Sequence, residues 1–412
     1  MSFLRSLFSG VSGLQNHQTM MDVIGNNIAN INTIGFKAGR ATFSELYAQT
    51  LQGGTQSVGS NGGINPIQVG LGMKTSSIDN LFTQGNIETT GQNTDLAIQG
   101  QAFFIVKKDG KDVYTRAGGF SLDGSGRLVN PGDGSIVQGK LADNLGNIPS
   151  GTQLSDLTIP LDQKSPAHAT TTVKFAGNLD SSAAVGTVVN SSVSVFDAMG
   201  NQHTVTLTFT NTGTNAWSWS AAVPLPATTA SAGTVTFDGT GALNTLTGSP
   251  LTVTTNNGSP NLSVVLDMGT PGVFSGLTQS KGDSTVTPRE QDGYGSGTLN
   301  GISIDAGGRI NGTFSNGTVM TLGQIMLAEF NNPSGLLKSG DNSWDVSGNS
   351  GTPAIVSPGN ESKIVSGALE QSNVDLSNEF TQMITAQRGF QANARVITTS
   401  DEFLQEIVNL KR

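Results

Sequence analysis

Cysteine is absent from this sequence of 412 residues, which excludes disulfide bonds and thiolate metal sites. Such a chain suits a reducing compartment, and it suits equally an exported protein that crosses a narrow channel unfolded. Charge is also scarce: charged residues make up 12% of the chain, about half the usual share, and the net charge is −9. Because lysines and arginines form no cluster that could follow a phosphate backbone, we expect no nucleic-acid partner.

Long apolar runs are lacking too. No stretch approaches the roughly 20 apolar residues of a membrane-spanning helix, so we expect no membrane insertion. The first residues, MSFLRSLFSGVSGLQNHQTM, have some features of a signal peptide, but Arg5, Ser9 and Gly10 interrupt their apolar part. We therefore expect no cleaved signal peptide.

Residues that could carry catalysis are few and scattered. The three histidines, His17, His168 and His203, lie far apart in the sequence and belong to no zinc motif. Nucleophile elbows and phosphate loops are missing, and the aromatic share of 6% speaks against a sugar-stacking cleft. We expect no enzyme, no cofactor and no metal. The alternative class is an enzyme or carbohydrate-binding β protein of the cell surface, which would need a concave pocket with convergent polar groups.

Glycine, in contrast, is abundant, with 54 residues, and threonine, serine and asparagine accompany it. This composition is typical of short strands joined by tight turns. Between residues 94 and 139, Asp109-Gly110, Asp123-Gly124 and Asp133-Gly134 are hairpin signals. We predict a mainly β fold with α-helices at the two termini.

Apolar residues recur every seven positions at both ends of the chain, which is typical of a helix with one apolar stripe. The N-terminal rows contain Leu7, Leu14, Met21 and Ile28, with Val11 offset. The C-terminal rows contain Leu376, Met383, Phe390, Ile397 and Leu404, with Phe380, Ala394 and Val408 offset. We predict that the two helices pair as a coiled coil along these rows. Two unrelated core helices in separate domains are the alternative.

The composition changes along the chain and suggests a nested domain plan. Residues 1–70 and 361–412 would form a terminal helical domain with its linker. Residues 71–146 and 284–360 would form a discontinuous β domain, and the Thr/Ser/Ala-rich segment 147–283 an inserted outer β domain. Chain termini that lie close together favour such nesting.

The outer faces of the predicted helices are poor in charge. Apolar residues outside the two C-terminal rows are Ile384, Val396, Phe403, Ile407 and Leu410. A helix pair in water normally carries many charges on its outer face, so these residues imply further partners. Heterologous contacts between identical subunits build helical filaments. We therefore expect self-assembly.

Two stretches carry a resemblance to a known family. The sequence GVSGLQNHQTMMDVIGNNIANINTIGFKAGRATF resembles the N-terminal motif of bacterial flagellar rod and hook proteins, and SNVDLSNEFTQMITAQRGFQANARVITTSDEFLQEIVNL resembles their C-terminal motif. The positions that match these motifs are Asn26, Asn27, Asn30, Gly35, Phe36, Arg388, Gly389 and Asn393.

The resemblance implies a structural role. The large middle segment favours the hook branch of the family, and a distal rod protein is the alternative. A hook subunit would polymerise into a tube that acts as a universal joint and passes motor torque to the filament. The implied partners are copies of the same chain, rod, hook-cap and hook–filament junction proteins, and the flagellar export apparatus. The implied place is extracellular, in the flagellum, reached by export without a cleaved signal peptide.

The asparagine-rich stretch NNIANINTIGFKAGRATF follows the N-terminal heptads. Asparagine side chains compete with the helix for backbone hydrogen bonds, so we predict that they end the helix and supply caps and turns. Apolar residues such as Ile34 and Phe36 remain available for burial. A surface loop is the alternative reading of this stretch.

Overall fold

The computed structural model describes residues 2–56, 62–151, 153–160, 162–359 and 361–410. The chain divides into two compact units. The helical unit consists of Met1–Ile159, Ser303–Asn311 and Thr321–Arg412, and the β unit consists of Pro160–Ile302 and Gly312–Met320.

The boundaries of the β unit differ from the segment 147–283 that the composition suggested. Strand β12 (Ser155–Asp156) pairs with β11 (Ile136–Leu141), and both belong to the helical unit. The composition therefore changes about a dozen residues before the fold does. At the other end, strands β24 (Gly297–Ile304), β25 (Arg309–Phe314) and β26 (Val319–Ile325) contain the points where the chain passes between the units.

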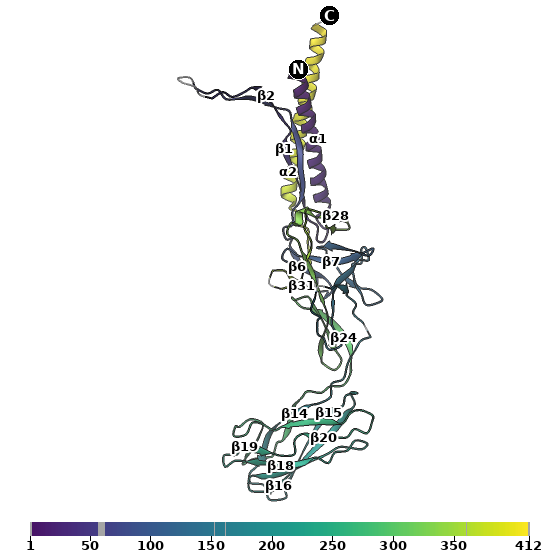
Figure 1. Cartoon of the computed structure of the whole chain (residues 1–412), viewed down its shortest axis with the longest axis vertical. Helices are drawn as coiled ribbons and strands as arrows, with labels where there is room; N and C mark the ends of the chain where they lie inside the picture. Colours follow the sequence, from purple (N-terminus) through teal and green to yellow (C-terminus); the bar gives the residue numbers. More distant parts are fainter. Residues whose placement is uncertain (1, 57–61, 152, 161, 360, 411–412) are drawn as a thin grey trace. The chain divides into compact units, whose positions relative to one another are not determined.

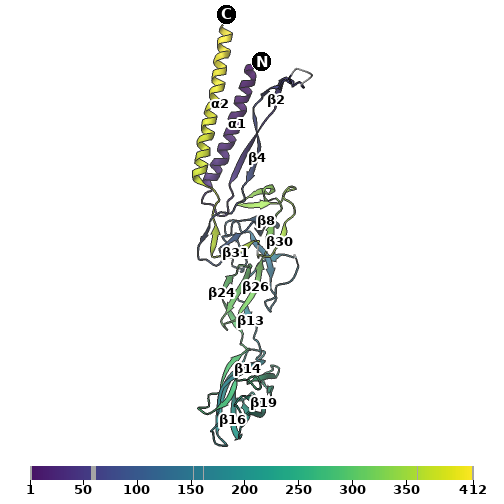
Figure 2. The same ribbon diagram turned by 90° about the vertical axis from the view of Figure 1, so that its left-hand side faces the viewer.

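Two α-helices run side by side in the helical unit, α1 (Ser2–Ala29) and α2 (Leu376–Leu410) (Figures 1 and 2). The terminal helices of the mainly β fold are thus confirmed. Asp375 is the N-cap of α2, since its carboxylate accepts the backbone N–H groups of Ser377 and Asn378 at 2.9 and 3.3 Å. No helix in the described part of the chain is long and apolar enough to cross a membrane.

A β-hairpin accompanies the helices. Strand β1 (Gly39–Glu45) pairs antiparallel with β4 (Met73–Asn80), and both strands contact α1. Between them, β2 (Ala48–Gln52) and β3 (Ile67–Gly70) form an exposed two-stranded ribbon.

The rest of the helical unit is a β domain. Its main sheet runs β26–β11–β7–β8–β29–β28. Early strands pair with late ones, β6 with β31 and β5 with β32. The chain thereby returns to the C-terminal end of α1 before α2 begins; this end of the helix pair is called its base. The bounds are β5 (Ile87–Thr89), β6 (Leu96–Gln99), β7 (Phe103–Lys108), β8 (Lys111–Thr115), β9 (Ser121–Leu122), β10 (Leu128–Val129), β26 (Val319–Ile325), β27 (Leu327–Glu329), β28 (Leu337–Gly340), β29 (Ser343–Asp345), β30 (Ala354–Val356), β31 (Lys363–Ser366) and β32 (Ala368–Glu370).

The β unit contains two sheets, β20–β21–β14–β22 with β23 beside β14, and β15–β16–β17–β18–β19. Large side chains such as Phe209, Trp217 and Trp219 fill one apolar core. The bounds are β13 (Lys164–Ser165), β14 (Thr172–Asp180), β15 (Val188–Phe196), β16 (Gln202–Gly213), β17 (Ala216–Ala222), β18 (Ala232–Phe237), β19 (Leu243–Leu246), β20 (Leu251–Val253), β21 (Leu262–Asp267), β22 (Leu277–Ser280) and β23 (Thr287–Gln291).

One turn recurs in both units. An aspartate accepts, through its carboxylate, the N–H of the residue four positions later, at Asp123, Asp143, Asp197, Asp238 and Asp305. In each turn the glycine at the third position after the aspartate has φ between +71° and +91°, a conformation that glycine adopts without strain. The predicted turn at Asp109-Gly110 joins β7 to β8, and both of its residues have positive φ.

Candidate functional site

The two terminal helices are antiparallel, and their register follows from a few contacts. Ser6 lies 3.4 Å from Ser400, and at the other end Asn27 donates a hydrogen bond to Glu379 at 3.1 Å. Between them, His17 lies against Gly389. The start of α1 therefore faces the end of α2, and one continuous seam joins the helices.

Glycines let the helices approach closely. A Cβ atom added to Gly13 would lie 2.5 Å from Nδ2 of Asn393, and one added to Gly389 would lie 2.5 Å from Nε2 of His17. Real Cβ atoms do not come so near, so a larger residue at either position would force the Asn393 or the His17 side chain to shift. Gly389 is thus a contact point of the seam rather than a defect of the helix.

The row of α2 that is most buried differs from the predicted apolar rows. Glu379, Ala386 and Ser400, at heptad spacing with Asn393, face α1. Among the predicted seam residues, Leu7, Leu14, Met21, Ile28, Met383, Phe390, Ala394 and Ile397 are half-buried, whereas Val11, Leu376, Phe380, Leu404 and Val408 are exposed. The physical reason is the close spacing, which leaves room only for small or hydrogen-bonding side chains at the centre. The small-residue pair Gly10 and Gly13 was the sequence signal for it.

Asn27 joins three elements at the base of the helices. Its Nδ2 donates to the carbonyl of Gly39 and its Oδ1 accepts the N–H of Gly39, both at 2.8 Å. The side chain thus acts like one residue of a β-ladder, and the same Nδ2 reaches Glu379. Burial raises the pKa of Glu379, while the hydrogen bond from Asn27 opposes this rise.

Two further asparagines act in the same way. Asn16 donates to the carbonyl of Met73 at 2.9 Å and accepts from the hydroxyl of Thr75 at 2.7 Å, which fixes β4 to α1. Asn373 accepts the N–H of Ala38 at 2.8 Å and donates to the carbonyl of Leu81 at 2.7 Å. These amides replace backbone pairing that the helices cannot offer to the strands. Both residues lie within the two stretches that resemble the family, but the motif positions named from the sequence did not include them.

The remaining motif residues have distinct positions. Asn30 donates to the carbonyl of Asn26 at 2.9 Å and accepts from Thr33 at 3.1 Å, so it supports the turn that ends α1. Gly35, with φ +69°, donates its N–H to the carbonyl of Glu370, and an added Cβ would lie 2.5 Å from the backbone of Ala117. Phe36 is buried, and Arg388 is exposed on α2.

A buried ion cluster lies beside this turn. Lys37 Nζ contacts Glu370 Oε1 at 2.6 Å, and Arg116 Nη1 contacts Glu370 Oε2 at 3.3 Å. All three side chains are nearly inaccessible, and burial lowers the pKa of Lys37 and of Arg116. The cluster joins the segment that follows α1, the strand before α2 and the β domain. Sequence reasoning missed it, because Glu370 lies 254 residues from Arg116 and 333 residues from Lys37.

Large apolar side chains remain exposed on the helices. Phe8 is 69% exposed on α1, and Phe380 and Ile384 are 50% and 58% exposed on α2. Val396, Phe403, Leu404, Ile407 and Val408 are further exposed apolar residues of α2, nearer its C-terminal end. Such a surface on a helix pair marks a place where another protein surface packs. Among the described residues, no group of three or more His, Asp or Glu side chains is placed to hold a metal ion.

Family models match most of the chain. The model described as flagellar hook protein FlgE/F/G D1 domain matches residues 97–179, and the flagellar basal body protein FlaE D2 domain matches residues 160–294. At the ends, the flagella basal body rod protein model matches residues 7–37, and the flagellar basal body rod FlgEFG protein C-terminal model matches residues 365–410.

Whole-length relatives agree with these models. The chain is 42% identical to the flagellar hook protein FlgE of Borreliella burgdorferi, covering 99% of this chain and 100% of that one. It is 34% identical to FlgE of Salmonella typhimurium over 98% and 100% of the two chains. The flagellar basal-body rod protein FlgG of Bacillus subtilis is 32% identical over 99% and 100%.

A solved structure shares the fold. The crystal structure of the Helicobacter pylori flagellar hook protein FlgE2 superposes with a TM-score of 0.51 at 15% identity, covering 67% of this chain and 98% of that one. The whole-length relatives place the chain in the flagellar hook protein family.

Proposed function

We propose that the chain polymerises with copies of itself through the exposed apolar faces of α1 and α2, and that these helices line the inner tube of a flagellar hook. The observation that carries the proposal is the exposed row on α2, of which Phe380 and Ile384 are members. Membership in the hook family makes the chain a structural subunit of the flagellum and its basal body. The rod protein of Bacillus subtilis, at lower identity, is the weaker alternative.

Each helix has exposed apolar residues outside the α1–α2 seam, such as Phe8 on α1 and Phe380 on α2. Small residues occupy the centre of the α1–α2 contact, so the large residues of the heptad rows lie at its margins or face outward. Burying an exposed Phe or Ile contributes about 1.5–3 kcal/mol. A repeated contact of this kind between identical subunits produces a helical tube.

The domain plan belongs to the same proposal. The terminal helical domain with its linker (1–70 and 361–412) would form the inner tube, the discontinuous β domain (71–146 and 284–360) the layer around it, and the inserted segment 147–283 the outermost part. The β unit is poor in charge and rich in Thr and Ser, so contacts there can exchange with water at about 0.5–1.5 kcal/mol per hydrogen bond. Sliding outer contacts around a firm inner tube would make a universal joint that bends but transmits torque.

Specific partners are proposed as well. The rod, hook-cap and hook–filament junction proteins would meet the two ends of the tube, and the flagellar export apparatus would deliver the chain outside the cell without a cleaved signal peptide. Immunoprecipitation of the chain from flagellated cells should recover these proteins.

Electron microscopy of the purified full chain tests the central proposal. We expect tubes for the unmodified chain and none for Phe380→Asp or Ile384→Asp, because a buried unpaired charge is costly. Thr381→Asp, at an exposed polar position of the same helix, is the matched control. Tubes formed by Phe380→Asp, or monodisperse particles of the unmodified chain, would contradict self-assembly through these faces.

The proposal that the β unit supplies the sliding outer contacts can be tested by removing most of this unit. His168 and Tyr294 exchange backbone hydrogen bonds at 2.9 and 3.0 Å, so a Gly-Ser turn can replace residues 170–292 with little strain. We expect this variant to polymerise with altered curvature. Complete loss of assembly would contradict the outer role of the segment.

A further inference from the structure

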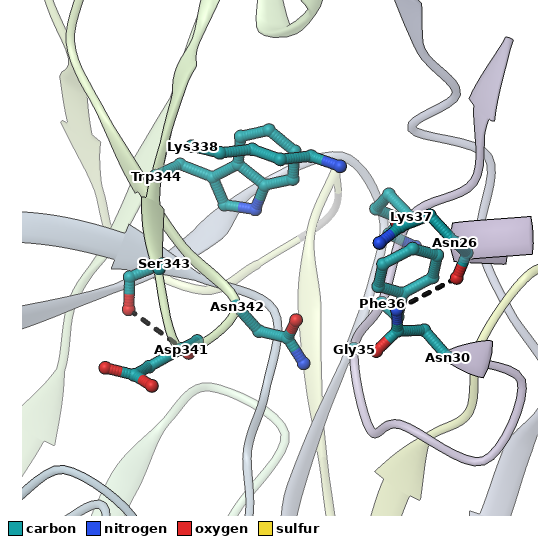
Figure 3. A pocket seen from close by; sticks show the side chains of 11 residues that line it. Asn26, Asn30, Gly35, Phe36, Lys37, Lys338, Asp341, Asn342, Ser343 and Trp344 are labelled. Carbon is teal, nitrogen blue, oxygen red and sulfur yellow. Dashed lines mark hydrogen bonds between the residues drawn. The ribbon is translucent and has the colours of Figure 1, made fainter. Parts of the chain in front are cut away.

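A cavity of about 190 Å³ opens at the base of the helices, between the segment that follows α1 and the β28–β29 hairpin (Figure 3). Asn30 and Phe36 line it on one side, and Lys338, Asn342 and Trp344 on the other. Its volume suits a single side chain rather than a folded segment.

Two hydrogen-bond donors of this cavity have no partner in the described part of the chain. Trp344 is only 3% exposed, yet its indole N–H donates to no acceptor there. In Figure 3 the indole nitrogen lies on the side of the ring nearer Asn342. A buried unpaired N–H group costs free energy. An acceptor that enters the cavity would remove this cost.

Lys338 supplies the second donor. Its Nζ lies 5.4 Å from the ring centroid of Phe36 and 5.6 Å from that of Trp344. The rings hold the ammonium at the cavity, and within the described residues no carboxylate pairs with it. Lys338 as a whole residue is exposed, but partial desolvation lowers its pKa, and a carboxylate beside it would raise this pKa again.

The other polar groups of the cavity are engaged. The Asp341 carboxylate binds Lys108 at 2.7 Å, and Asn342 Nδ2 donates to the carbonyl of Ile34 at 2.9 Å. Lys37 also lines the cavity, and its ammonium shares the single carboxylate of Glu370 with Arg116. Within the described residues, Lys338 is therefore the cation of the cavity that has no carboxylate partner, which favours an acidic occupant.

The end of α2 has the matching chemistry. Residues 401–409 are all exposed, and Ser6, close to the start of α1, already faces Ser400, so α1 can cover little of this end. The stretch carries Asp401, Glu402 and Glu406 and no basic residue. Glu402 and Glu406 are one turn apart and share a face of the helix.

We propose that this cavity receives a glutamate side chain, from Glu402 or Glu406 at the end of α2, in a second copy of this chain. The carboxylate pairs with Lys338 and accepts the Trp344 indole N–H. This contact rests on the proposed self-assembly and adds to it a polar, directional link between the end of one helix pair and the base of another.

A double-mutant cycle in the full chain tests the pairing. The critical concentration for polymerisation is measured by sedimentation for the unmodified chain, for Lys338→Met, for Glu402→Gln/Glu406→Gln and for the combined variant. We expect an increase of about tenfold for each single change, since a charge-assisted hydrogen bond is lost. The combined variant should be no worse than either, because both changes remove one interaction.

Lys111→Met, at an exposed lysine of β8, is the matched control and should leave the critical concentration unchanged. Lys338→Arg should retain most of the assembly. Additive effects in the cycle, or polymerisation of Lys338→Met at the concentration of the unmodified chain, would overturn the proposal.

A second measurement does not depend on polymerisation. A synthetic peptide of residues 400–410 is added to the monomeric full chain, and the Trp344 indole N–H signal, identified by its loss in Trp344→Phe, is followed by NMR. We expect this signal to shift with the peptide and to shift much less with its Glu402→Gln/Glu406→Gln version. An unchanged signal, or equal shifts with both peptides, would overturn the proposal. A chain that never polymerises but shows the selective shift would contradict only the proposed self-assembly.

Discussion

The β unit and the helix pair are stabilised in opposite ways. In the β unit, large side chains such as Trp217, Trp219 and Phe209 are fully buried between two sheets. In the helix pair, small and polar side chains such as Gly13, Ala386 and Ser400 are at the centre, and Phe8, Phe380 and Ile384 face outward. The first region satisfies its apolar surface within one chain, whereas the second leaves that surface for a neighbour. A subunit of a polymer needs both kinds of region.

Removing a large core residue should affect the β unit most. Trp219→Ala deletes a fully buried side chain whose Nε1 donates to the carbonyl of Thr247 at 3.0 Å. We expect a loss of about 3–5 kcal/mol in the free energy of unfolding of this unit. Calorimetry should show its transition at lower temperature, while circular dichroism keeps the helical signal. Phe274→Ala, at an exposed position, is the control. A parallel loss of helix would mean that the two regions are not independent.

Glu370→Gln should produce the next largest effect, at the base of the helices. The change leaves Lys37 and Arg116 buried without their shared carboxylate. We expect the helical unit to lose about 3 kcal/mol, because a buried charge without its partner is costly. Chemical unfolding followed by helical circular dichroism measures this loss. Glu88→Gln, at an exposed glutamate of β5, should change little, and equal stability of the two variants would argue against a structural role of the cluster.

These elements also show what a sequence reveals. The helices and the Asp109-Gly110 hairpin could be predicted, because seven-residue spacing and turn residues are local signals. The Lys37–Glu370–Arg116 cluster could not, since no spacing links residues so far apart. The heptad rows identified the helices, but their most apolar row is not the most buried one. Burial in the seam depends on how closely the helices approach, and Gly13 and Gly389 set that distance through tertiary contacts.

Two glycines of α1, one in the seam and one in open space, separate the effect of packing from that of backbone entropy. Gly13→Ala places a Cβ atom 2.5 Å from Asn393, whereas around Gly25 of the same helix no atom lies within 4 Å of an added Cβ. We expect Gly13→Ala to destabilise the helix pair by about 1–3 kcal/mol and Gly25→Ala to stabilise it by about 0.5–1 kcal/mol. Amide hydrogen exchange over residues 5–29 and 376–400 measures both. Equal effects would show that backbone entropy, and not packing in the seam, determines how a substitution at these positions changes the stability of the helix pair.

The smallest expected effect is a dependence on pH that belongs to the β unit alone. Burial alone would raise the pKa of Asp197, but hydrogen bonds from Asn257, Asn201 and His203 outweigh it and lower the pKa below its usual range. A carboxylate with a lowered pKa in the folded state stabilises the fold at pH values above its unfolded pKa of about 3.9. This contribution disappears as the pH falls below that value, because the unfolded state then binds the proton first.

Acid titration followed by tryptophan fluorescence should therefore show the β unit losing stability below about pH 4, and Asp197→Asn should flatten this dependence while lowering stability at neutral pH. The fluorescence reports mainly this unit, because Trp217 and Trp219 lie in its core. Glu379 in the helix pair has the opposite shift, since burial raises its pKa. Its protonation on acidification removes a buried charge, so the helix pair should tolerate acid better than the β unit. If the helical signal were lost at higher pH than the tryptophan signal, the contrast between a polar seam and an apolar core would not explain the acid response.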